Sequence, residues 1–135
     1  MADGLTEAQH RLVNAVLDMV EGDPGWRHMF IHAEFIGSGP MLRSLVESFV
    51  VRQPPDPGGR APAPVDEPVL AAIEALHAAY DAAGQGFTAL DLTVDAPDGR
   101  YRFEFGQAPS LRLAGEADPG AIKRLDARYV ALARR

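Results

Sequence analysis

Two histidines and one glutamate lie close together in the segment WRHMFIHAEF, residues 26–35. Side chains alternate between the two faces of an extended strand, so all three are expected on one face, together with Trp26. Imidazole and carboxylate groups can act as general acids and bases or bind a metal ion. A regular strand, however, separates His28 from His32 by about 13 Å, which is too far for two ligands of one zinc ion. The pattern therefore favours a polar, partner-facing patch over a metal site or a catalytic site.

Three further carboxylates, Asp91, Asp95 and Glu104, lie in the stretch GFTALDLTVDAPDGRYRFEF, residues 86–105. A pair of carboxylates can hydrolyse a glycosidic bond, but neither a companion nucleophile nor an aromatic substrate platform accompanies these residues. The sequence also has no phosphate-binding loop, dinucleotide fingerprint or nucleophile elbow. A solvated sheet face is therefore favoured, and neither a catalytic residue nor a cofactor is assigned.

The carboxylates of both segments suggest an acidic surface. If Glu34 shares a sheet face with Asp91 and Glu104, three carboxylates converge there and would attract a basic partner. The same charges would also serve simply to keep the protein soluble, and the residues alone favour that simpler role. The candidate partner-binding residues are Trp26, His28, His32, Glu34, Asp91, Asp95 and Glu104.

The alternation in residues 86–105 predicts the β-hairpin that would position these carboxylates. The connector Ala96-Pro97-Asp98-Gly99 has the proline and glycine that a four-residue turn needs. Such a turn also fixes which residues of the two strands are opposite each other. The predicted pairs are Leu90 with Phe105, Leu92 with Phe103 and Val94 with Tyr101 on the apolar face, and Asp95 with Arg100 and Asp91 with Glu104 on the polar face.

The remaining elements follow from periodicity and from turn residues. A helix starting at Thr6 ends at the turn of residues 22–25, a second helix runs from Asp66 to Gly84, and a third begins at Asp118. Residues 26–35 form a strand with apolar side chains on both faces, which indicates a central position. Residues 41–52 fit either a helix or a strand, and propensity does not decide between the two. Residues 53–65, with five prolines, form a loop.

This order predicts an α+β fold, an antiparallel sheet of about four strands packed by two to three helices. The 135 residues correspond to a single domain, 1–135. There is no cysteine, which is compatible with a cytoplasmic location, and no signal peptide or membrane-spanning segment is expected. The net charge of -6 argues against direct binding to nucleic acid. Residues 117–135, with two acids and five bases, are the only basic region.

Three blocks occur in an order that a known family shares. They are the strand that opens at Trp26 and ends in Ala33-Glu34, the helix containing Leu70, Ile73, Leu76 and Tyr80, and the hairpin with Phe87–Asp95, Asp98–Tyr101 and Phe103–Phe105. In this order they resemble the YezG-like family of bacterial immunity proteins, which are antitoxins for secreted polymorphic toxins of the LXG type. The likeness extends from the first helix to the hairpin, and more loosely to the terminal helix with Tyr129. It implies that residues 41–52 contain a strand covering at least Leu45–Arg52.

The resemblance implies a noncatalytic inhibitor that binds the C-terminal toxic domain of its cognate toxin inside the producing cell. Toxins paired with the family include nucleases, whose basic active sites an acidic surface would suit. A toxin that consumes a nucleotide cofactor is the nearest alternative target. An adaptor or scaffold domain with a non-toxin partner, and an enzyme of unrecognised type, stay open as other classes of function. The oligomeric state is also open.

Overall fold

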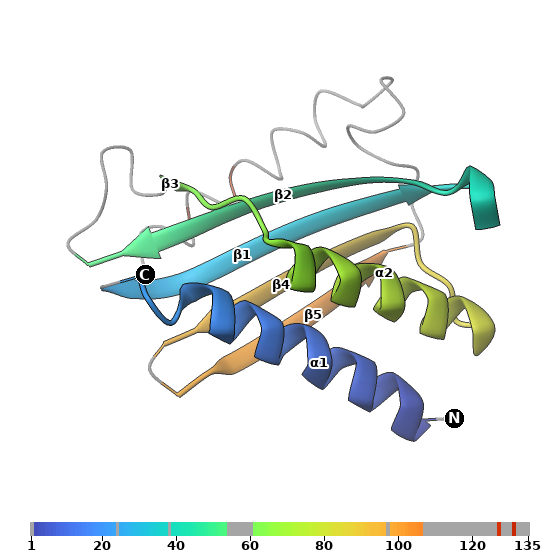
Figure 1. Ribbon diagram of the computed structural model, residues 1–135, viewed down its shortest axis with the longest axis horizontal. Helices are drawn as coiled ribbons and strands as arrows, with labels where there is room; N and C mark the ends of the chain where they lie inside the picture. Colours follow the sequence, from blue (N-terminus) through green and yellow to red (C-terminus); the bar gives the residue numbers. More distant parts are fainter. Residues whose placement is uncertain are drawn as a thin grey trace.

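The computed structural model of the chain describes residues 2–23, 25–37, 39–53, 61–96 and 98–106, together with Ala127 and Ala131. Along the chain the elements are α1 (Ala2–Val20), β1 (Trp26–Ile36), the 3-10 turn η1 (Gly39–Met41), β2 (Arg43–Arg52), β3 (Ala61–Pro62), α2 (Glu67–Ala82), β4 (Ala89–Asp95) and β5 (Arg100–Gly106). The strands form one antiparallel sheet in the order β3-β2-β1-β4-β5. Both helices lie side by side on one face of it (Figure 1). The predicted α+β class is confirmed, with five strands in place of about four.

The core lies between the two helices and the sheet. β1 is the central strand, as its two-sided apolar pattern predicts, and its odd-numbered residues from Met29 to Phe35 face the helices. The ring of His77 on α2 stacks on Phe35 at a centroid distance of 4.1 Å, which joins the helix to the middle of the sheet. The bulkiest fully buried apolar side chains are Leu12, Val16, Met29, Ile31, Val50, Ile73, Leu76, Leu90 and Leu92.

The hairpin of β4 and β5 has the predicted register at every position. Leu90, Leu92 and Val94 are opposite Phe105, Phe103 and Tyr101, and Asp91 and Asp95 are opposite Glu104 and Arg100. Leu90, Leu92 and Val94 are fully buried, whereas the exposed aromatic side chains of β5 lie towards the edge of the sheet. The second helix is confirmed as well, since the Asp66 carboxylate accepts a hydrogen bond from the backbone N–H of Val69 at 3.1 Å.

Three boundaries differ from the sequence-based expectations. The first helix begins at Ala2 and not at Thr6, because Leu5 adds another apolar contact with the core on the same helix face. The expected strand over Leu45–Arg52 is confirmed but begins at Arg43, and the helical alternative for 41–52 is wrong. The predicted loop 53–65 contains the short strand β3, in which Ala61 is opposite Val50. The predicted helix from Asp118 lies outside the described residues except for Ala127 and Ala131.

Trp26 does not share the face of the histidines, contrary to the simple alternation. The pairing of β1 with β2 shifts register between Trp26 and His28, which marks a β-bulge. One additional residue in the strand reverses the side on which Trp26 lies, and its side chain packs against the hydrophobic core beneath the helices. Neither described helix combines the length and apolar content that crossing a membrane requires.

The turn between α1 and β1 is tied to the end of β2. The Arg52 guanidinium donates two hydrogen bonds of 2.8 Å to the carboxylate of Asp23, and this contact holds the pKa of Asp23 below its usual value. The backbone N–H of Gln53 donates to the carbonyl of Gly25 at 2.7 Å. Gly25 has a φ of +80°, and a Cβ at this position would lie 2.6 Å from the carbonyl oxygen of Gln53. Only glycine therefore fits this close approach.

We expect Gly25→Ala to destabilise the fold by about 1–3 kcal/mol, because the new methyl group meets backbone atoms and the residue must keep a left-handed conformation. Urea unfolding followed by circular dichroism measures the change. Gly22→Ala is the matched control, since it lies in the same turn and a Cβ there meets no atom within 4 Å. Equal stability of the two variants would contradict the proposed steric conflict.

Candidate functional site

The polar residues predicted to share a face do so on the side of the sheet opposite the helices. Register places His32 between Asp91 of β4 and Glu47 of β2, and Glu104 of β5 lies one strand further out. His28 is opposite Asp95 in the same way, and Glu34 follows His32 on the same side of β1. The pairing of strands that are distant in sequence thus brings the two carboxylate-bearing segments together.

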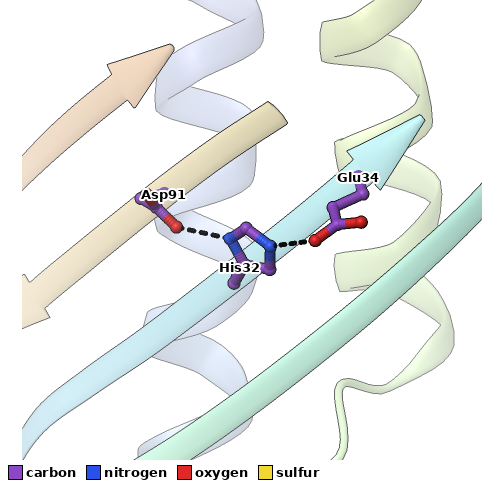
Figure 2. A network of polar contacts seen from close by, with 3 residues as sticks. All are labelled: His32, Glu34 and Asp91. Atoms are coloured by element: carbon purple, nitrogen blue, oxygen red, sulfur yellow. Dashed lines mark hydrogen bonds and ion pairs between the residues drawn. The ribbon is translucent and has the colours of Figure 1, made fainter. Parts of the chain in front are cut away.

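His32 is held between two carboxylates in the interior of the protein. Its Nδ1 lies 2.7 Å from Asp91 Oδ1, and its Nε2 lies 2.6 Å from Glu34 Oε2. Figure 2 shows the imidazole bridging the two carboxylates across β1 and β4, with both helices behind the strands. The side chains of His32 and Glu34 are 2% and 0% exposed, and that of Asp91 is 14% exposed. The three form a buried polar network, called here the His32 network.

The geometry favours a protonated imidazole. A neutral imidazole has one N–H and can donate to only one of the two carboxylates, whereas an imidazolium donates to both. Burial alone would lower the pKa of His32, but the hydrogen bonds and charges of Asp91 and Glu34 outweigh it and raise this pKa above its usual value. A protonated His32 gives each carboxylate an oppositely charged neighbour inside the sheet.

This arrangement suits a structural role better than catalysis. A general base needs a free ring nitrogen within reach of the substrate proton, and both nitrogens of His32 already face carboxylate oxygens. A metal ligand needs an unprotonated nitrogen in the same way. Within the described part of the chain, no group of three histidine or acidic side chains could hold a metal ion. The His32 network instead links β1 with β4 on the polar side.

The second histidine forms a smaller, more accessible pair. His28 Nδ1 lies 2.6 Å from Asp95 Oδ1, with side-chain exposures of 12% and 34%. The other ring nitrogen, Nε2, is buried and has no hydrogen-bond partner among the residues that the structure describes. Asp95 is thus the more reachable half of this pair.

The seven predicted site residues fall into three groups. His28, His32, Glu34, Asp91 and Asp95 are brought together, Trp26 packs against the core, and Glu104 lies apart on β5 with its side chain 44% exposed and 3.3 Å from Arg102. Their part in binding a partner stays a prediction. Among the six polar residues of this set, Asp95 and Glu104 are the most exposed, at 34% and 44% of their side-chain surface.

Two pockets bordered by described residues lie on the helical side. The larger, of about 430 Å³, lies between β2 and the start of α2, and its lining includes Ser48, Val65 and Leu70. The smaller, of about 220 Å³, lies between α1 and α2 beside Leu5. Neither is lined by a titratable side chain or by any predicted site residue. An enzyme using His28, His32 and Glu34 would need a pocket at those residues, and these two do not supply it.

An acidic surface that the sequence analysis did not single out lies on the outer side of the helices. Glu67, Glu74 and Asp81 are seven residues apart on α2, and all three are exposed. A seven-residue step is close to two full helical turns, so the three carboxylates follow one line along the helix. Glu7 and Asp18 add two more exposed carboxylates on α1. The spacing was visible in the sequence, but the pattern of apolar residues drew attention to the other side of the helix.

We expect His32→Gln to lower the free energy of unfolding by about 3 kcal/mol near neutral pH, because it leaves two buried carboxylates without their cation. Folding raises the pKa of His32, so its stabilisation is complete below pH 6.5 and is lost as the pH rises through the folded-state pKa. The stability difference between wild type and variant should therefore shrink above that pKa. Urea unfolding across a pH series measures it.

His10→Gln is the matched control, since His10 is exposed on α1 and its ring Nε2 lies 3.1 Å from the Tyr101 hydroxyl. Should His32→Gln fail to fold, the His32 ring signals of the wild type can be followed by NMR against pH. A midpoint below 6.5 would refute the bridging imidazolium.

A scan against protein-family models finds no match to the chain, and a search of the curated proteins finds no significant match either. The resemblance of the hairpin and its flanking blocks to the YezG-like family stays a prediction.

Proposed function

We propose that the chain is a noncatalytic immunity protein that binds and neutralises the C-terminal toxic domain of a cognate secreted toxin in the cytoplasm of the producing cell. The observation that carries the proposal is the acidic outer side of the helical layer. The two helices contain six acidic residues and a single basic residue, Arg11. Among the described residues, this surface offers a partner more accessible carboxylates than the enclosed His32 network does.

The outer side of α2 is suited to close contact. Between its three exposed carboxylates lie the exposed alanines Ala71 and Ala78, whose short side chains allow another protein to approach the helix. The carboxylates are about 10 Å apart along the axis, which is comparable to the screening length of about 8 Å in physiological salt. Their fields therefore overlap weakly, and the line attracts an extended basic surface better than a single cation.

A nuclease fits this surface as the target, because its active site must be basic to hold phosphate groups. An acidic, rigid protein can occupy such a groove and gain fast association from electrostatic steering. Rigidity is supported by the packing, since Val69, Ile73 and Leu76 of α2 are fully buried against the sheet. A preorganised helix loses little conformational entropy on binding.

The primary test is expression of the neighbouring open reading frame upstream, with and without this chain, scored as colony survival. Rescue of growth together with co-purification of a stable complex is the expected result. Toxicity without rescue, or rescue without a complex, would overturn the proposal.

We expect Glu74→Lys to slow association with the toxin about three- to tenfold at low salt, with a smaller effect at high salt, because it reverses the central charge of the α2 line. Stopped-flow or surface-based kinetics measures the rate. Asp98→Lys is the matched control, since it makes the same change in net charge at an exposed position in the β4–β5 turn. An equal effect of both variants would show that only net charge matters and would refute docking on α2.

A further inference from the structure

The two edges of the sheet differ in how they are protected. β3 forms one edge with two residues, one of them Pro62, and a proline cannot donate a hydrogen bond to a further strand. β5 is the opposite edge of the described sheet, with seven residues and no proline (Figure 1). A strand of this length can serve as a template for pairing with another strand.

The aromatic side chains of β5 are exposed but already ordered. Tyr101 is 40% exposed and Phe105 is 38% exposed, two of the few large apolar side chains with so much open surface. Their rings lie on the helical side of the sheet with Phe103 between them, at centroid distances of 5.7 Å in both directions. Phe105 also contacts the ring of Tyr80 on α2 at 4.7 Å. The rings thus form a fixed row, so covering them would cost little side-chain entropy.

The charges on the other side of β5 are self-complementary when two copies of the strand pair. Arg102 and Glu104 are two residues apart, on either side of Phe103, with exposures of 76% and 44%. If two copies of the strand run antiparallel with Phe103 opposite Phe103, Arg102 of each copy is opposite Glu104 of the other. In the same register Tyr101 is opposite Phe105, and Arg100 is opposite Gly106. Every charged pair is then attractive, and every aromatic ring has an aromatic partner.

We propose that β5 is a self-pairing edge, which joins two copies of this chain into a dimer with its two-fold axis at Phe103. The interface is isologous, as in most soluble homodimers. Because opposite residues of an antiparallel pair point to the same side, the helical layers of both copies lie on one side of a continuous sheet. The aromatic rows then meet beneath the helices, and the Arg102 and Glu104 side chains form a cluster of alternating charge on the opposite side.

Analytical ultracentrifugation tests the dimer with the full chain. We expect the wild type to sediment at twice the 14.5 kDa mass of one chain. Arg102→Glu places two acidic side chains opposite each other at both 102–104 pairs of the dimer. Glu104→Arg places two basic side chains opposite each other at the same two pairs. Each substitution should weaken self-association about tenfold or more. Arg100→Glu is the matched control, since Arg100 is opposite a glycine in this register and its reversal should leave the dimer intact.

Mixing the two variants separates pairing from misfolding. Arg102→Glu has two acids on this side of β5 and Glu104→Arg has two bases, so one copy of each restores both attractive pairs. An equimolar mixture should therefore form a heterodimer as tight as the wild-type dimer, although each variant alone self-associates at least about tenfold more weakly. A monomeric wild type would overturn the proposal and indicate that Arg100 and Arg102 prevent the edge strand from pairing with another strand. Single variants that dimerise as tightly as the wild type, or no heterodimer in the mixture, would overturn this register and the interface with it.

Discussion

One buried imidazole determines how the two halves of the sheet can meet. His32 reaches Asp91 on the neighbouring strand and Glu34 on its own strand, and all three lose most of their contact with water. A slip of β4 by one residue would bring Leu90 or Leu92 to the position opposite His32 and move Asp91 to the helical side. Asp91 would then be buried without its histidine and His32 would keep only Glu34, at a cost of several kcal/mol. The His32 network therefore specifies the register, besides any net stability that it adds.

This register decides which surfaces remain for other molecules. β1 is closed on one side by the two helices and is largely buried on the other, where Phe30, His32 and Glu34 lie. Its neighbours β2 and β4 are paired on both edges. Exposed charged and aromatic side chains are consequently found at the periphery, on the outer side of α2 and along β5. The first surface is acidic with small side chains, and the second has aromatic rings and charges of both signs.

Local patterns explain why the fold was largely predictable from the sequence. The β4–β5 hairpin has a short turn and strict alternation, so its register depends on nearby residues alone. β3 was not predicted because two residues carry no periodicity, and its pairing with β2 depends on tertiary contacts. Trp26 was misplaced because a bulge breaks the alternation without a sequence signal as clear as a turn glycine.

The candidate site was harder to predict than the fold. Alternation correctly placed His28, His32 and Glu34 on one face, but it reports only the side of a strand and not the depth of burial. An exposed acidic sheet face and a buried charge network have the same sequence pattern. Depth depends on everything packed against the sheet, which no single segment contains. The α2 carboxylates were predictable in principle, since their seven-residue spacing is local, yet a helical surface of this kind is common on soluble proteins.

The two peripheral surfaces respond to salt in opposite ways, and this follows from their charges. The proposed capture of a basic partner by α2 would depend on long-range attraction, which screening weakens. The proposed pairing through β5 would depend on short contacts between aromatic rings and between opposite charges, and the acidic helical layers of the two copies would lie on one side and repel each other. Moderate salt screens that repulsion more than it weakens the close contacts, so it favours the dimer while it slows the encounter with the partner. The charge on the helices thus governs the encounter with a partner, and the apolar surface of β5 governs self-pairing. Both surfaces are positioned by the strand register that the His32 network specifies.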